Sequence, residues 1–299
     1  MSYSCWIIYN GYLQSNKFID FASMFDHAAN TAGDNTTIYR NDEIMTLIAN
    51  NLIVNGKQVQ RPDYVIFTDK DIYLAKQLEI LHIPVFNCST TIEISDDKIK
   101  TYQALKFANI PIPETIVAPK TYGLPIHLDN SYIKYVMDTL GFPLVIKETF
   151  GSFGEQVYLI ENEAALYKKI EEIGGKPFMF QKFINTSYGV DLRLQVVGNE
   201  VVASMKRVAE NDFRANVTNG GKMMAYIPND EERRIAIQAS NAIGAHFSGV
   251  DLLFGKDGKP IVCEVNSNAH IRNLYDCTGI DASHAIIEHI HRVLNSTNK

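Results

Sequence analysis

Two apolar runs near the C-terminus flank the pair Asp257-Gly258, and this pattern constrains the fold more than any other. The run 249–254 precedes the pair and the run 260–266 follows it. Asp-Gly between two such runs is a strong signal for a β-hairpin with a two-residue turn. The sequence therefore predicts two antiparallel strands in this region.

If that turn sets the register, Lys256 pairs with Lys259 and Asp251 lies directly opposite Glu264. Asn266 shares a face with Glu264, because side chains two residues apart on a strand point the same way. Opposed carboxylates repel across roughly 4.5–5.5 Å between Cβ atoms. Three oxygen ligands of this kind suit Mg²⁺, which removes that repulsion. Taken alone, the hairpin fits an ordinary solvated acidic face equally well.

The other face of the hairpin is predicted to be the core side. It carries Val250, Leu252, Phe254, Cys263 and Val265. The four cysteines of the chain show no CxxC spacing. We interpret them as scattered buried thiols, which is typical of proteins in a reducing cytosol.

Bulk properties predict a soluble, cytoplasmic protein. The 299 residues suggest two or three structural units, and 46% apolar residues allow a large core. The net charge of −6 gives no general attraction to nucleic acid or to an acidic membrane surface. The N-terminus does not read as a signal peptide, and no apolar run approaches the ~18 residues of a membrane span. We expect neither nucleic acid nor membrane as a partner.

The first unit, residues 1–93, alternates short apolar runs with helical patterns. The predicted strands are Trp6–Tyr9, Ile38-Tyr39, Tyr64–Phe67 and Pro84–Phe86. The predicted helices lie near 16–31, 42–50 and 71–81. This rhythm favours a small parallel α/β sheet covered by helices. No GxGxxG follows the first strand, so a dinucleotide is not expected there, and one wall of a substrate cleft is the expected role.

A second unit, residues 94–299, has a mixed α+β pattern. Ser95 is predicted to cap a helix that runs to Ala108, and Ile110–Pro113 then forces an extended path. Lys98 lies in the first helical turn, where the helix dipole disfavours a cation unless an anion is near. Lys147 ends an apolar strand beside a Gly/Ser loop, a place where phosphate can bind. Each lysine alone is more commonly just solvated.

Four stretches match one known family in order and spacing over about residues 95–293. They are DDKIKTYQALKFANIPIPET, GFPLVIKETFGSFG, QKFINTSYGVDLRLQVVGNEVVASMKRVAENDFRANVTNGG and SGVDLLFGKDGKPIVCEVN. With them the chain resembles the ATP-grasp superfamily, and within it the RimK-like carboxylate–amine ligases. The resemblance implies an ATP-grasp fold preceded by a small Rossmann-like domain. It also implies a lid subdomain at about 105–180 and a metal-bearing subdomain at about 181–299.

The resemblance implies roles for individual positions. ATP-binding positions are Lys98, Lys147, Gly151, Ser152, Gly154, Gln181, Lys182, Phe183, Ile184, Asp191, Arg214 and Asn216. Catalytic contacts are Lys147, Arg207 and Arg214, and metal ligands are Asp251, Glu264 and Asn266. The alternative for Asp191 is a simple surface pair with Arg193. A regular hairpin through Gly198-Asn199 puts Arg207 on the face away from Asp191, so either the strand twists or bulges there, or Arg207 has another role.

The chain departs from the family pattern at three places. Lys182 stands where relatives usually have glutamate, and Gln156 lies where the loop usually has another glycine. After the metal hairpin, Ser267–Arg272 replaces the usual Pro-Gly turn. That segment is expected to border the cleft, where His270 and Arg272 could recognise a substrate carboxylate. A solvated loop is the alternative.

The resemblance implies a ligase that uses ATP and Mg²⁺, with one or two ions and Mn²⁺ as an alternative. The γ-phosphoryl group passes to a carboxylate, and an amine attacks the acyl phosphate. Substrates are small-molecule carboxylates and amines, or a protein or peptide acceptor that receives glutamate or another amino acid. A nucleotide-binding regulatory protein on the same fold is the second hypothesis. His284, His289 and His291 are expected at the surface, and homo-oligomers remain open.

Overall fold

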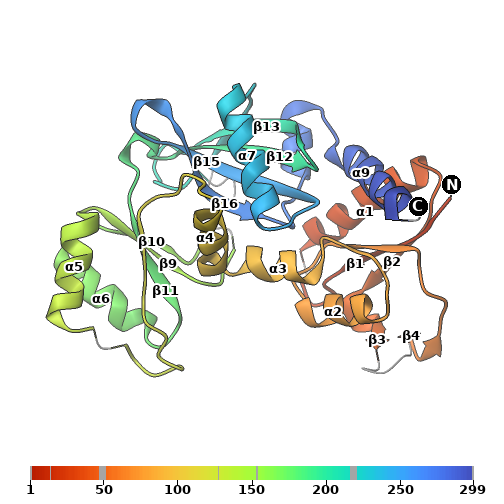
Figure 1. The fold of residues 1–299 in the computed structure, drawn as a ribbon, viewed down its shortest axis with the longest axis horizontal. Coiled ribbons are helices and arrows are strands. Elements are labelled where there is room, and N and C mark those ends of the chain that lie inside the picture. Colours follow the sequence, from red (N-terminus) through yellow and green to blue (C-terminus); the bar gives the residue numbers. More distant parts are fainter. Residues whose placement is uncertain are drawn as a thin grey trace.

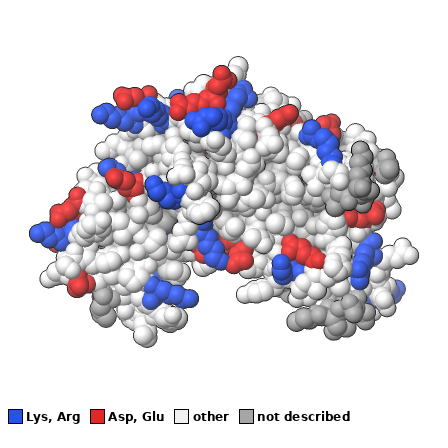
Figure 2. Space-filling model, viewed as in Figure 1, with Lys and Arg blue, Asp and Glu red and all other residues white. Residues whose placement is uncertain are grey.

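The computed structural model describes residues 2–13, 15–46, 52–126, 128–152, 154–215 and 221–297. Figure 1 shows a sheet near both chain ends, a small sheet with two helices on the opposite side, and a larger sheet between them. Figure 2 shows acidic and basic side chains intermixed over one face. Within the described residues, no helix is long and apolar enough to cross a membrane.

Four parallel strands form the first sheet in the order β2-β1-β6-β7. Its elements are β1 (Ser4–Tyr9), α1 (Asn16–Thr31), β2 (Asn35–Arg40), β6 (Tyr64–Phe67), α2 (Ile72–Ile80) and β7 (Val85–Phe86). The predicted strands and two of the three predicted helices are confirmed. The short buried runs pair as parallel strands because helices cover both faces of the sheet.

The helix predicted at 42–50 is wrong where the structure describes it. Asn41–Glu43 form one 3₁₀ turn, and β3 (Ile44–Thr46) pairs with β4 (Leu52–Val54), which pairs with β5 (Lys57–Gln58). Residues 47–50 of the prediction lie outside the described residues. Ile44 is buried in a core cluster with Leu52 and Val54, so tertiary packing overrides the local helical pattern.

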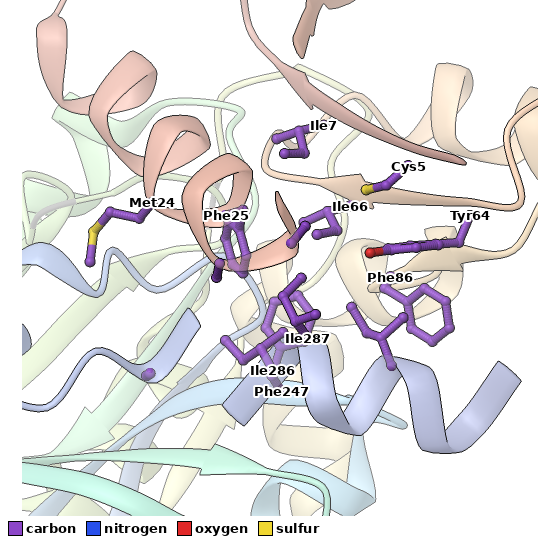
Figure 3. Close-up of a cluster of buried hydrophobic side chains, with 14 of the residues drawn as sticks. Cys5, Ile7, Met24, Phe25, Tyr64, Ile66, Phe86, Phe247, Ile286 and Ile287 are labelled. Carbon is purple, nitrogen blue, oxygen red and sulfur yellow. The ribbon is translucent and has the colours of Figure 1, made fainter. Parts of the chain in front are cut away.

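The C-terminal helix α9 (Ala282–Thr297) completes the core of this first sheet. Figure 3 shows Ile286 and Ile287 of α9 beside Phe25 of α1 and near Tyr64 of β6. The predicted division of the chain between residues 93 and 94 stays a proposal, since this core contains side chains from both sides of it.

His284, His289 and His291, which are expected at the surface, are each half-buried. His291 Nε2 lies 2.7 Å from Asp34 Oδ2, and His289 Nε2 lies 3.2 Å from His246 Nδ1. The helix α9 packs on the first sheet, so neighbouring elements cover part of each of these histidines.

Two helices, α3 (Ser89–Asp96) and α4 (Lys98–Phe107), lead from the first sheet to the rest of the chain (Figure 1). The cap predicted at Ser95 is wrong, because Ser95 lies in the last turn of α3. Asp97 caps α4 instead, and its carboxylate accepts a hydrogen bond from Lys100 N at 3.0 Å. Lys98 is therefore the first residue of α4, where its charge opposes the helix dipole.

The second sheet, called here the lid sheet, has the order β10-β9-β11-β8. Its elements are β8 (Thr115–Val117), α5 (Asn130–Leu140), β9 (Leu144–Glu148), β10 (Val157–Ile160), α6 (Glu163–Ile173) and β11 (Phe178–Lys182). The helices α5 and α6 bury one face of it around Ile146, Leu166 and Phe180. The other face is left to line a cavity.

The five-stranded sheet has the order β14-β13-β12-β15-β16. Its elements are β12 (Val190–Val197), β13 (Glu200–Val208), β14 (Lys222–Ala225), α7 (Asp230–Ala242), β15 (Phe247–Phe254), β16 (Pro260–Asn266) and α8 (Arg272–Thr278). Ile235 and Ala239 of α7 pack against Leu194 and Val250 on one face. Charged side chains lie on the opposite face because strand side chains alternate.

Candidate active site

A cavity lies between the lid sheet and the five-stranded sheet, with α4 at its wall. Predicted site residues that line it are Lys98, Lys147, Gly151, Gly154, Gln181, Lys182, Phe183, Ile184, Asp191, Arg214, Asp251 and Glu264. Ser152, Arg207 and Asn266 do not line it. Asn216 lies outside the described residues. Residues from distant parts of the chain thus converge on one place.

Two lysines approach the cavity from different elements. Lys147 on β9 is only 7% exposed, and its Nζ donates to Tyr102 Oη at 3.2 Å. Burial acts to lower the pKa of Lys147, but neighbouring groups, Cys263 and Glu264 among them, raise it overall. Burial also lowers the pKa of Lys98, and there it prevails over the opposing charge of Glu264. Two ammonium groups so close together favour an anion between them.

The loop between β9 and β10, called here the glycine loop (149–156), is bound by cations through its main chain. Lys98 Nζ donates to Gly151 O at 2.9 Å, and Arg214 Nη1 donates to Gly154 O at 2.6 Å. Arg214 also contacts Asp212, with Nη2 and Oδ2 2.8 Å apart. Two loop carbonyls therefore accept hydrogen bonds from cationic side chains that could bind an anionic ligand instead.

Gln156 of the glycine loop lines the cavity and packs against Gly151. Gly151 has φ +139°, and an added Cβ would lie 2.0 Å from Gln156 Oε1. The backbone angle favours glycine there, and any larger residue would also have to displace the Gln156 side chain. Gln156 Oε1 is buried and has no hydrogen-bond partner among the described residues. The Gln156 side chain, at a position where glycine is expected from the family pattern, therefore fills space beneath the loop.

The end of β11 and the two residues after it line the hinge side of the cavity. Gln181 is 2% exposed, and its Nε2 donates to Thr115 Oγ1 at 2.9 Å. Lys182 Nζ lies 2.5 Å from Glu114 Oε2, an exposed pair outside the core. Glu114 thus supplies, next to Lys182, the negative charge that a glutamate at position 182 would have brought.

The predicted pairing of Asp251 with Glu264 in the Asp257-Gly258 hairpin is confirmed. The turn itself is longer than the predicted two residues. Lys256–Gly258 form a 3₁₀ turn, and Gly255 N donates to Lys259 O at 2.7 Å. Lys256 is therefore not the strand partner of Lys259. The longer turn shifts the pairing by one residue.

A β-bulge at Cys263 takes up this shift. Asp251 pairs with Glu264, but Leu252 pairs with Val262, which leaves Cys263 without a partner across the ladder. Val262 packs in the core, and Cys263 lines the cavity with its Sγ 3.8 Å from Lys147 Nζ. The prediction that Cys263 faces the core is wrong, because the bulge turns it to the other face.

A second bulge brings Arg207 to Asp191. The β12–β13 register shifts between Gln195 and Val196, so Asp191 pairs directly with Arg207. Arg207 Nε and Nη2 each lie 2.6 Å from the Asp191 carboxylate, and Arg207 Nη2 lies 2.9 Å from Asp251 Oδ2. Of the two alternatives for Arg207, the bulge is confirmed.

Arg193 binds the other side of Asp251, which the sequence analysis missed. Its Nε donates to Oδ1, and its Nη2 donates to Oδ2 at 2.8 Å. Burial acts to raise the pKa of Asp251, but the two guanidinium groups hold it below its ordinary value. Burial raises the pKa of Asp191, and the charge of Asp251 adds to this effect.

The residues fit a Mg²⁺ ion by their chemistry. A carboxylate offers about four lone-pair positions, and the arginines take three on Asp251, so one remains. Asn266 Nδ2 is buried and has no partner among the described residues, and rotation of its amide would present an oxygen there. Within the described ranges no group of three His, Cys, Asp or Glu side chains could hold a metal. The set therefore needs Asn266 and ligands from outside the chain.

The expected carboxylate binders of the Ser267–Arg272 segment are used elsewhere. Arg272 donates from Nε and Nη2 to Asp20 at 2.8 and 2.7 Å. His270 packs between Phe18 and Phe21, and burial lowers its pKa to about 4. A neutral, packed histidine is a poor carboxylate receptor, and Arg272 already has a carboxylate partner, so these contacts give the prediction no support.

The segment instead forms hydrogen bonds that connect the end of β16 with α3 and with the loop after β6. Ser267 Oγ lies 2.6 Å from Ser95 Oγ, and Asn268 Nδ2 donates to Asp69 O at 2.6 Å. Two of the missed site residues could have been found from spacing alone. Tyr102 lies one helical turn after Lys98, and Arg193 lies two strand positions after Asp191. Nothing in the local sequence announces the bulge at Cys263.

Comparisons with known proteins agree with this arrangement. The family model for the RimK-like ATP-grasp domain matches residues 95–290. A probable alpha-L-glutamate ligase 1 of Shewanella frigidimarina is 32% identical over 96% of each chain. A RimK domain ATP-grasp protein of Sphaerobacter thermophilus superposes with a TM-score of 0.71 at 19% identity, over 95% of this chain and 98% of that one. The ATP-grasp ligase PsnB, solved with minimal precursor, Mg and ADP, has a TM-score of 0.71 at 15% identity, over 97% and 98%.

Proposed function

Because this chain belongs to the RimK-like ATP-grasp family of ATP-dependent ligases, we propose that it joins a carboxylate to an amine through an acyl phosphate. One observation carries the proposal. Lys98, Lys147 and the pair Asp251/Glu264 meet at one cavity under the glycine loop, although they come from four separate elements. That is the charge arrangement that phosphoryl transfer needs, since it relies on positioning and electrostatic stabilisation.

In this proposal the two lysines bind the phosphates of ATP, and the glycine loop closes over them. The main chain of 181–184 contacts the adenine edge, and Asp191 lies near the ribose. Arg214 and Arg207 stabilise the transferred phosphoryl group, as guanidinium groups match phosphate geometry, although Arg207 does not line the cavity in this structure. Arg214 must then exchange its contact with Gly154 O for the nucleotide.

Asp251, Glu264 and Asn266 would hold Mg²⁺, with one or two ions and Mn²⁺ as a substitute. When bound, Mg²⁺ neutralises charge that develops on the phosphate oxygens. Arg193 and Arg207 keep the Asp251 carboxylate ionised and fixed in orientation. No protein nucleophile is required for this chemistry.

For the substrate we propose an amino acid such as glutamate, added to a small molecule or to a peptide. The relative named as a probable alpha-L-glutamate ligase and the neighbour solved with a peptide precursor support these two classes. Because Arg272 pairs with Asp20 and His270 packs against α1, we assign recognition of the acid to other residues. A cytoplasmic location and a homo-oligomer remain part of the proposal.

A screen of amino acids and peptides for acceptor-dependent ADP release tests this function, with mass spectrometry of the products. The proposal expects a mass increase that corresponds to one or more amide bonds. A nucleotide-binding regulatory protein would bind ATP but show no acceptor-dependent turnover across the screen, and that result would overturn the ligase.

A further inference from the structure

Lys70 brings a third ammonium group to the glycine loop, from a part of the chain outside the family match. It lies directly after β6, at the carboxyl end of a central parallel strand. In open α/β sheets, ligands bind in the crevice at this edge. The N-terminal sheet thus contributes a cation to a place that the lid sheet and α4 also reach.

The contacts of Lys70 join three separate elements. Its Nζ lies 2.5 Å from Asp96 Oδ1, at the end of α3, and donates to Ser152 Oγ at 3.2 Å. Ser152 belongs to the glycine loop, whose neighbouring Gly151 accepts a hydrogen bond from Lys98. Adjacent loop residues are therefore each bound by a lysine, one from the first sheet and one from α4.

Electrostatics place Lys70 within range of the other site cations. The pKa of Lys98 is lowered chiefly by burial, and the charges of Lys147 and Lys70 add to this effect. Three like charges that feel one another raise the free energy of the empty site. An anion with several oxygens relieves that repulsion, which fits a polyphosphate better than a single carboxylate.

The ion pair between Lys70 and Asp96 adds little to folding stability, so stability does not explain why Lys70 lies there. The side chain of Lys70 is 45% exposed and that of Asp96 is 28% exposed. Pairs exposed to this degree contribute at most about 1 kcal/mol to folding. A long exposed lysine can also leave Asp96 and Ser152 without disturbing the core, so it is free to move to a ligand.

We propose that Lys70 is a further phosphate-binding residue, which contacts the terminal phosphoryl group of ATP when the glycine loop closes. The proposal rests on the proposed function, because it needs ATP in the cavity. It means that the first sheet, which is expected to form the substrate wall, also takes part in holding the group that is transferred. Loop closure and the position of the first sheet are then coupled through one side chain.

Calorimetric titration of the full chain with ADP and with a non-hydrolysable ATP analogue, both with Mg²⁺, tests this inference. Lys70→Met should lower the affinity for the ATP analogue by about tenfold, or ~1.4 kcal/mol, and should leave the affinity for ADP within about twofold of wild type. Lys70→Arg should restore most of the loss. Lys76→Met on α2 is the matched control, since Lys76 is 58% exposed and pairs only locally with Glu79.

Two results would overturn the inference. An equal loss of affinity for ADP and for the ATP analogue would mean that Lys70 acts only through the glycine loop. Binding by Lys70→Met that equals binding by Lys76→Met would mean that Lys70 makes no contact. Failure of the proposed function looks different, because then the wild-type chain would bind neither nucleotide or would show no acceptor-dependent turnover.

Discussion

Replacement of Arg207 by methionine tests whether this arginine compensates the buried charges of Asp191 and Asp251. Arg207 is 6% exposed and lies between Asp191 and Asp251, which are 7% and 4% exposed. Asp251 retains Arg193, but Asp191 loses its bidentate partner. Breaking a buried pair in this way costs roughly 3–5 kcal/mol, because one charge remains buried without compensation.

The loss should depend on pH, with a sign that follows from Asp191. Without Arg207 only the weaker effect of the Arg193 charge opposes burial, so the folded-state pKa of Asp191 rises further above its unfolded value of ~3.9. A carboxyl group with a raised folded pKa favours the folded state only at low pH. The variant should therefore lose stability relative to wild type as pH rises from about 4 towards neutrality.

Denaturant unfolding at pH 5 and pH 7 measures both effects. Arg234→Met is the control, since Arg234 is an exposed residue of α7 and should change stability by less than ~0.5 kcal/mol. The double variant Arg207→Met/Asp191→Asn should recover part of the loss, because the uncompensated charge is gone. A loss below ~1 kcal/mol that is equal at both pH values would refute the reasoning.

Further predictions concern the glycine loop and the first sheet. Gly151→Ala should lower ATP affinity by about tenfold or more, because its Cβ would clash with Gln156 Oε1 at 2.0 Å and φ is +139°. Calorimetry checks this, and full affinity in the variant would contradict it. Protonation of His270, whose pKa burial lowers to about 4, should cost stability as pH falls from ~6.5 towards 4. His270→Phe should flatten that decline in thermal unfolding, and an unchanged pH profile would contradict the assignment.

Much of the site could be predicted because its residues lie in regular strands with strong local signals. The Asp257-Gly258 pair fixed a hairpin, and alternation placed Asp251 and Glu264 on one face. That register held although the turn was predicted too short, because the bulge at Cys263 compensated for the error. The correct pairing of Asp251 with Glu264 therefore did not ensure that Cys263, the neighbouring residue, was assigned to the correct face.

What sequence could not supply is the identity of long-range partners. Arg272 and Asp20 lie far apart along the chain, and no local pattern shows that they form a bidentate pair. The helix expected at 42–50 failed for the same reason, since the burial of Ile44 depends on strands that follow it. Lys70 gave no local signal because its contacts belong to α3 and the glycine loop.

The central claim is that the cavity binds ATP together with Mg²⁺ at the Asp251–Glu264 pair. The most direct measurement is the affinity for a non-hydrolysable ATP analogue at increasing Mg²⁺, for wild type and Glu264→Gln. Wild-type affinity should rise with Mg²⁺, and Glu264→Gln should lose most of that dependence while its circular dichroism spectrum stays unchanged. The same Mg²⁺ dependence in both proteins would contradict the account.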